Sequence, residues 1–197
     1  MTGQPPSSPP PGQLADRRIA VALTGGIACY KAATLVSRLV QAGADVRVLM
    51  TEPATHFITP LTLQSLSGRA VLTTMWQVDD QPDSQHIGVA RWCDLLVIAP
   101  ATATTIARIA TGLADDLVSL VVCALPRDTP VLVAPAMNEQ MWQSPVTQRN
   151  VKTLRETLGH QIVGPGEGWQ ACRTTGAGRM VEPDAIHDAI TTTLATR

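Results

Sequence analysis

The chain has 197 residues and a net charge of −1, and 45% of its residues are hydrophobic while 16% are charged. A chain of this size buries enough apolar surface to fold as one domain without a metal or disulfide staple. Near-zero charge and only four tryptophans, one tyrosine and one phenylalanine argue against a nucleic-acid surface, which needs basic and stacking side chains.

The four cysteines show no CxxC spacing, which argues against a zinc site and a disulfide framework and favours reduced thiols in a cytoplasmic protein. Residues 1–16 are rich in proline, so we expect a disordered tail rather than a secretory signal, with the folded domain at 17–197. The longest apolar stretch, residues 117–125, is too short to span a bilayer, so no membrane association is expected.

The folded part begins with a strand–helix–strand pattern. An apolar run at residues 19–23 ends at two glycines, which is typical of a strand buried on both faces. Residues 27–43 have apolar side chains at helical spacing and end at Gly43, and residues 45–51 form a second strand pattern. This order predicts a parallel βαβ unit with a right-handed crossover.

Strand and helix patterns continue to alternate through the rest of the chain. The alternation predicts a single doubly wound α/β domain of the Rossmann or flavodoxin kind with a mostly parallel central sheet. The expected strands are 94–101, 130–137 and 161–165; the expected helical segments are 53–68, one beginning near His86, 102–112, 114–125, 144–159 and 181–195; and 164–180 is expected to be a glycine-rich loop.

Ligands of such sheets bind beyond the carboxyl ends of the strands, so the candidate functional residues are those in the segments that follow strands. Gly25, Gly26 and Ile27 follow the first strand and open a helix, where glycine lets the backbone approach a phosphate and free N–H groups face it. The spacing is not GxGxxG, so a mononucleotide phosphate is favoured over a dinucleotide, with an ordinary tight turn as the alternative. Thr51 stands where NAD-binding sheets commonly carry a carboxylate, although Glu52 is adjacent.

Polar side chains also follow the third and fourth strands. Thr102, Thr104 and Thr105 begin a helix and suit a phosphate or the polar edge of a flavin, whereas helix capping would require only one of them. Asn138 and Met141 lie three residues apart in PAMNEQMW. A neutral amide can hold a carboxylate without stabilising its ground state as strongly as an arginine would. The alternative is a capping asparagine followed by core methionines.

Two further residues could take part in proton transfer. His86 follows a polar stretch and by itself favours a surface or satisfied histidine over a base. Cys172 lies in the glycine-rich segment, unlike a core cysteine, and the neighbouring Arg173 could favour its thiolate.

Taken together, the motifs resemble the homo-oligomeric flavin-containing cysteine decarboxylases, most closely the phosphopantothenoylcysteine decarboxylase branch. The resemblance covers residues 17–183, and the motifs that carry it, in the family's order, are TGGIACYKA, TEPATHFITPLTLQSLSG, SQHIGVARWCD, APATATTIARIATGLADDLVS, PAMNEQMW and ACRTTGAGRM. It implies FMN-dependent decarboxylation of 4′-phosphopantothenoylcysteine to 4′-phosphopantetheine in coenzyme A biosynthesis, by transient oxidation of the thiol to a thioaldehyde.

The resemblance also implies roles for individual residues. The catalytic residues would be His86, Asn138 and Cys172, and residues 164–180 would form a loop that covers the substrate. The substrate-binding residues would be Asn138, Met141, Ala136, Met137, Arg179 and Met180. The FMN-binding residues would be Gly25, Gly26, Ile27, Thr51, Phe57, Pro100, Ala101, Thr102, Thr104 and Thr105, with no metal.

The family implies a homotrimer or a dodecamer of trimers with the flavin near a subunit interface, and a separate phosphopantothenoylcysteine synthetase in the pathway. Two positions depart from the family pattern. Thr104 stands where relatives often have Asn, and Arg173 stands where they often have Gly, which adopts a positive φ more freely. The alternatives are a peptidyl-cysteine decarboxylase of lantibiotic maturation, a non-catalytic flavin-binding regulatory protein and, more weakly, a flavin prenyltransferase.

Overall fold

The computed structural model describes residues 12–76 and 84–196, and its centre is a five-stranded parallel sheet. The strand order β2-β1-β3-β4-β5 is that of flavodoxin-like folds, with the topological switch between β1 and β3. This confirms the predicted α/β class and the parallel sheet. The strands are β1 (Arg18–Leu23), β2 (Asp45–Met50), β3 (Leu95–Ala101), β4 (Val131–Pro135) and β5 (Gln161–Ile162).

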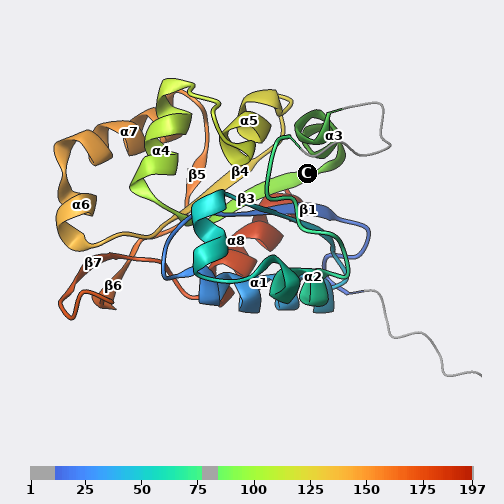
Figure 1. The fold of residues 1–197 in the computed structure, drawn as a ribbon, viewed down its shortest axis with the longest axis horizontal. Coiled ribbons are helices and arrows are strands. Elements are labelled where there is room, and N and C mark those ends of the chain that lie inside the picture. Colours follow the sequence, from blue (N-terminus) through green and yellow to red (C-terminus); the bar gives the residue numbers. More distant parts are fainter. Residues whose placement is uncertain (1–11, 77–83, 197) are drawn as a thin grey trace, which may run out of the picture.

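Helices cover both faces of the sheet, as Figure 1 shows. One face carries α1 (Cys29–Gln41), α2 (Pro60–Ser67) and α8 (Pro183–Ala195). The other carries α3 (Gln85–Trp92), α4 (Ala103–Thr111), α5 (Leu117–Ala124) and α7 (Pro145–Glu156). Two short elements, the 3-10 helix η1 (Glu52–His56) and the helix α6 (Glu139–Gln143), follow β2 and β4 at the carboxyl edge of the sheet.

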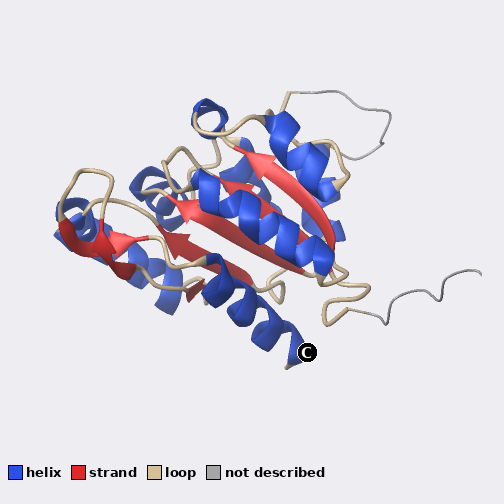
Figure 2. Cartoon of the chain, turned by 90° about the horizontal axis from the view of Figure 1, so that it is seen from below, coloured by secondary structure: helices blue, strands red, loops and turns tan. Residues whose placement is uncertain are grey.

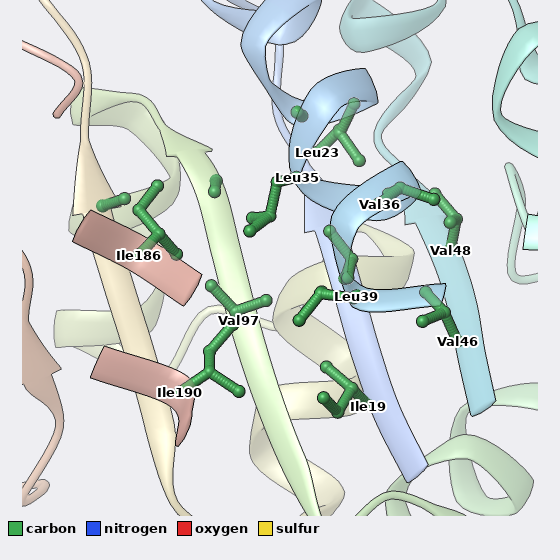
Figure 3. Close-up of a cluster of buried hydrophobic side chains, with 14 of the residues drawn as sticks. Ile19, Leu23, Leu35, Val36, Leu39, Val46, Val48, Val97, Ile186 and Ile190 are labelled. Atoms are coloured by element: carbon green, nitrogen blue, oxygen red, sulfur yellow. The ribbon is translucent and has the colours of Figure 1, made fainter. Parts of the chain in front are cut away.

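Two hydrophobic cores result, because alternate residues of each strand point to opposite faces of the sheet. In β1, Ile19, Val21 and Leu23 join the core under α1 and α8, while Ala20 and Ala22 join the core on the other face. Figure 3 shows the first core, in which Leu35 and Leu39 of α1 pack onto the strands. Every residue of β3 is buried, which explains its uninterrupted apolar sequence.

The glycine-rich segment is not the loop that the sequence predicted. It forms an antiparallel hairpin of β6 (Gly166–Trp169) and β7 (Thr175–Arg179), separate from the central sheet. A bond from the Gln170 N–H to the Thr174 carbonyl oxygen, 2.8 Å long, closes its turn. The two strands were not predicted because alternate residues in them are glycines, which have low strand propensity. Figure 2 shows the hairpin beyond the edge toward which the strands of the main sheet point.

The folded domain begins earlier than the expected boundary at residue 17. Leu14 is 1% exposed, and its N–H donates to the Ala42 carbonyl oxygen across 2.9 Å. Residues 12–16 are therefore packed onto the domain, while residues 1–11 of the expected tail lie outside the described residues. Within residues 12–76 and 84–196, no helix has the length and apolar character needed to cross a membrane.

Candidate active site

A cavity of about 780 Å³ lies beyond the carboxyl ends of β1, β3 and β4, and the hairpin forms one of its walls. Its volume is within the range of small-molecule and cofactor sites. Most of the residues expected to bind a ligand line it. They are Gly25, Gly26, Ile27, Thr51, Thr102, Thr104, Thr105, Ala136, Met137, Asn138, Met141, Cys172, Arg179 and Met180.

The turn after β1 is shaped by close packing. An ideal Cβ placed on Gly25 would lie 2.5 Å from the Cβ of Pro53, so only glycine allows η1 to approach this turn. The N–H groups of residues 25–27 donate to no protein acceptor within the described parts of the chain. With α1 beginning at Cys29, this turn offers free donors at the cavity wall, where an anionic group would be stabilised.

Threonine hydroxyls connect the ends of β1 and β3. The Thr24 hydroxyl donates to the Pro100 carbonyl oxygen at 2.7 Å and accepts from the Thr102 N–H at 3.0 Å. Thr102 caps α4 by accepting from the Thr105 N–H at 3.4 Å, so the capping alternative is correct for that residue. Thr104 remains exposed on the cavity wall. A single polar network therefore fixes two of the segments that border the cavity.

Thr51 presents an unsatisfied hydroxyl to the same cavity. Its side chain is buried, and its Oγ1 has no hydrogen-bond partner. A buried hydroxyl without a partner is uncommon in folded proteins, because the lost bonds to water are not replaced. A ligand with a polar edge at this position would supply the missing partner.

Asn138 both caps α6 and faces the cavity. Its Oδ1 accepts from the Met141 N–H at 2.8 Å, which leaves the Nδ2 donors free of protein partners among the described residues. Met141 is 46% exposed, so the interpretation as a core methionine is wrong for this residue. The capping bond fixes the orientation of the amide and points its donors away from the helix.

Cys172 lies at the tip of the hairpin with an exposed thiol on the cavity wall. Its Sγ is 3.0 Å from the Thr174 Oγ1 and 3.5 Å from the Gln170 Oε1. The neighbouring Arg173 has a φ of 65°, so the turn keeps the left-handed backbone that glycine would adopt without strain.

The charged groups of the cavity wall are cations. Lys31, Arg108 and Arg179 line it, and no carboxylate side chain does so within residues 12–76 and 84–196. Each cation has a carboxylate partner behind the wall: Arg108 contacts Asp115 at 2.7 Å, and Lys31 and Arg179 both contact Glu182. The Lys31 hydrogen bond holds the pKa of Glu182 below its ordinary value. The cavity side of the wall thus presents hydrogen-bond donors, while the carboxylates that balance their charge do not line the cavity.

Four of the expected site residues do not line the cavity of a single chain. Pro100 and Ala101 lie within β3, and Phe57 is 48% exposed at the end of η1. His86 lies at the start of α3, where its Nε2 is 3.4 Å from the Ser84 hydroxyl. Figure 1 places α3 at the opposite side of the molecule from the hairpin, and His86 is not among the residues that line the cavity with Asn138.

Ten of the described residues that line the cavity were not among those expected from the sequence, and three of them, Lys31, Gln170 and Arg108, hold the wall by polar contacts. Lys31 is 5% exposed, and its Nζ donates to the Met180 carbonyl oxygen and to Glu182, both at 2.9 Å. Gln170 is 6% exposed, and Arg108 is held by two aspartates. The only available signal was a lysine inside the apolar stripe of α1, next to the buried Ala32.

Comparisons with known proteins agree with this geometry. The Flavoprotein family matches residues 7–195. The coenzyme A biosynthesis bifunctional protein CoaBC of Haemophilus influenzae is 44% identical over 178 residues, covering 90% of this chain and 44% of that protein. The CoaBC protein of Escherichia coli is 47% identical over 175 residues, covering 89% of this chain and 42% of that protein. The chain thus spans less than half the length of these curated relatives.

Among solved structures, a cysteine-to-serine mutant of PPC decarboxylase complexed with pantothenoylaminoethenethiol superposes with a TM-score of 0.82 and 32% identity. That match covers 91% of this chain and 98% of the other. The FMN-dependent cysteine decarboxylase SpaF matches with a TM-score of 0.79 and 30% identity, covering 93% and 98% of the two chains. By sequence and by structure, this chain belongs to the Flavoprotein family.

Proposed function

We propose that this protein is an FMN-dependent decarboxylase that converts 4′-phosphopantothenoylcysteine to 4′-phosphopantetheine, a step of coenzyme A biosynthesis in the cytoplasm. The observation that carries the proposal is one cavity whose wall brings together the Asn138 amide, the Cys172 thiol and the free backbone donors of residues 25–27. The similarity to CoaBC proteins and to PPC decarboxylase supports the choice of substrate.

The residues present suit FMN. The unpartnered Thr51 hydroxyl suits the polar edge of an isoalloxazine ring, and the turn at residues 25–27 suits its phosphate. Thr102, Thr104 and the first turn of α4 add polar groups on the adjoining wall. The Lys31, Arg108 and Arg179 side chains on the wall would add hydrogen-bond donors for a flavin phosphate and an anionic substrate.

The chemistry explains why a redox cofactor is needed. A carboxylate on a saturated carbon has no place for the electron pair that departing CO₂ leaves behind. Oxidation of the neighbouring CH₂–SH to a thioaldehyde, with loss of a hydride and a proton, makes the substrate resemble a β-keto acid. FMN, when bound, supplies this two-electron chemistry by accepting a hydride and later returning it. Loss of CO₂ then gives an ene-thiolate, and the net reaction exchanges the carboxylate for a proton.

The side chains of the chain hold the substrate and move protons. Asn138 would donate from Nδ2 to the substrate carboxylate, a neutral contact that leaves departure of CO₂ favourable. Cys172 would give its S–H proton to the α carbon of the ene-thiolate, and the resulting thiolate would regain a proton from solvent. The hairpin would shield the site from water.

His86 would accept the proton of the substrate thiol, and we propose that a second copy of the chain delivers it, within a homotrimer or a dodecamer of trimers. Its position at the start of α3, outside the cavity of its own chain, supports such an arrangement. The cavity wall carries exposed apolar side chains that a neighbouring subunit could cover, since Ile27 is 58% exposed and Tyr30 61%, and Leu61 of α2 is 69% exposed. Burial of these groups against a neighbouring subunit would stabilise the oligomer. A phosphopantothenoylcysteine synthetase would supply the substrate.

Co-expression of two inactive variants tests the proposal. His86→Asn and Cys172→Ser should each bind FMN, yet the first should release no CO₂ and the second should accumulate an unsaturated ene-thiol product. If sites are shared between subunits, co-expressed variants should recover part of the saturated product. Normal turnover by His86→Asn would contradict its role, and preference for a peptide ending in cysteine over 4′-phosphopantothenoylcysteine would favour the peptidyl-cysteine alternative.

A further inference from the structure

Gln170 occupies an unusual position between the hairpin and the segment that carries Asn138. It is 6% exposed although it lies in the turn of a largely exposed hairpin, and it lines the cavity. Figure 1 shows α6 lying against the hairpin, so the two walls meet at this point. A buried amide at such a junction needs partners for all its polar groups.

All the hydrogen-bonding groups of the Gln170 amide are used. Its Nε2 donates to the carbonyl oxygens of Ala177, at 2.8 Å, and of Gly176, at 3.3 Å. Its Oε1 accepts from the Glu139 N–H at 3.2 Å and from the Cys172 thiol at 3.5 Å. A rotation that exchanged oxygen and nitrogen would set donor against donor and acceptor against acceptor, so the partners fix one orientation.

The two groups that donate to the Gln170 Oε1 are both linked to the proposed mechanism. Glu139 directly follows Asn138 and is the first residue of α6, and the thiol is that of Cys172 itself. The same amide therefore holds the start of the Asn138 helix and the proton donor on the opposite wall. Because a glutamine is neutral, it does this without adding a charge next to the substrate carboxylate.

We propose that Gln170 is a positioning residue that holds the Cys172 thiol and the Asn138 segment at a fixed separation across the substrate. This inference rests on the proposed function, in which the thiol protonates the ene-thiolate after CO₂ has left. In that step the S–H bond of Cys172 breaks while a C–H bond forms at the α carbon. A thiol that is not held would protonate this carbon too slowly, and the unsaturated product would escape before it is reduced.

The test compares Gln170→Met, which keeps the side-chain length but removes every hydrogen bond, with wild type and with Gln161→Met. Gln161 is an exposed glutamine that accepts one side-chain bond, from Thr193, and it does not line the cavity, so it controls for the substitution itself. CO₂, saturated product and ene-thiol are quantified for FMN-loaded protein. The ene-thiol share should rise roughly fivefold or more in Gln170→Met, the factor expected when one hydrogen bond is lost, and should stay unchanged in Gln161→Met.

A second variant separates positioning from a merely structural role. Gln170→Glu keeps the acceptor oxygens but turns an ionised carboxylate toward the Ala177 and Gly176 carbonyls. Protonation of the introduced carboxylate restores one donor. The fraction of saturated product made by Gln170→Glu should therefore approach the wild-type fraction as the pH falls, while the fraction made by Gln170→Met should not. If Gln170→Met fails to fold, this pH profile decides the question. A wild-type product ratio in Gln170→Met, or a flat ratio in Gln170→Glu, would overturn the inference.

A readout without substrate distinguishes the failure of this inference from failure of the proposed function. The rate at which iodoacetamide alkylates Cys172, followed by mass spectrometry of the hairpin peptide, should increase in Gln170→Met because the thiol and turn are released. Cys172→Ser serves as the blank. An increase without any wild-type CO₂ release would uphold the positioning role and reject the proposed activity. An unchanged alkylation rate would reject the positioning role.

Discussion

The two walls of the cavity are built by different physical means. The sheet-side wall follows strands that are buried on both faces, so hydrophobic packing fixes the strands that end beside Gly25, Thr51 and Thr102, and hydroxyl hydrogen bonds link the ends of β1 and β3. The hairpin-side wall has little apolar packing of its own, and a few polar contacts made by Lys31 and Gln170 hold it against α1 and α6. The sheet side therefore rests on extensive packing, while the side carrying Cys172 depends on a small number of contacts.

The largest expected effect falls on the sheet-side wall. Leu35 is fully buried between α1 and the strands, as Figure 3 shows. Leu35→Ala should lower the free energy of unfolding by about 2–5 kcal/mol, because it removes apolar contacts and leaves a cavity. Urea unfolding followed by circular dichroism measures it. A loss below about 1 kcal/mol would mean that this core does not dominate global stability.

The hairpin should respond locally to a change at Gly178. This residue has a φ of 122°, and a Cβ there would lie 2.6 Å from the Met137 carbonyl oxygen. Gly178→Ala should therefore weaken the docking of the hairpin by roughly 2–3 kcal/mol through strain and overlap. Hydrogen exchange should speed up in residues 166–179 while the urea midpoint shifts little. Equal changes in both measurements would show that the two walls unfold as one unit.

The salt bridge at the base of the hairpin gives a smaller, pH-dependent effect. The hydrogen bond from Lys31 lowers the pKa of Glu182 below its ordinary value of 4.5. Its contribution to stability is therefore complete above pH 4.5 and is lost as the pH falls through the lower pKa of the folded state. Thermal unfolding of Glu182→Gln should depend less steeply on pH below 4.5 than that of wild type. The effect should be small because Glu182 is exposed. If the unfolding temperatures of wild type and Glu182→Gln depended equally on pH, the Lys31–Glu182 pair would not contribute to stability.

The smallest effect is expected at the hairpin tip. Arg173 has a left-handed backbone, which strains a residue with a side chain. Arg173→Gly relieves this strain but gives the unfolded chain more freedom, so we expect a net stabilisation of about 1 kcal/mol or less. The local free energy of opening from hydrogen exchange of residues 170–175 measures it. A destabilised tip would show that the arginine side chain makes stabilising contacts that outweigh its backbone strain.

The sheet-side wall was predictable from the sequence, whereas much of the hairpin-side wall was not. Buried parallel strands are continuous apolar runs, and the residues that follow them, such as Thr102 and Asn138, face the cavity because strands end at one edge. Lys31 and Gln170 acquire their positions only from tertiary partners such as the Met180 and Ala177 carbonyl oxygens. No local pattern encodes such pairings. The helix beginning near His86 was predicted, but in a single chain this residue does not line the cavity.

The most direct test of the central claim is a product balance with 4′-phosphopantothenoylcysteine labelled with ¹³C in its carboxylate. The purified chain should take up FMN and become yellow. It should then release labelled CO₂ and saturated 4′-phosphopantetheine in equal amounts, with no external oxidant or reductant. A protein that binds no flavin, or that binds it and leaves the labelled carboxylate intact, would contradict the account.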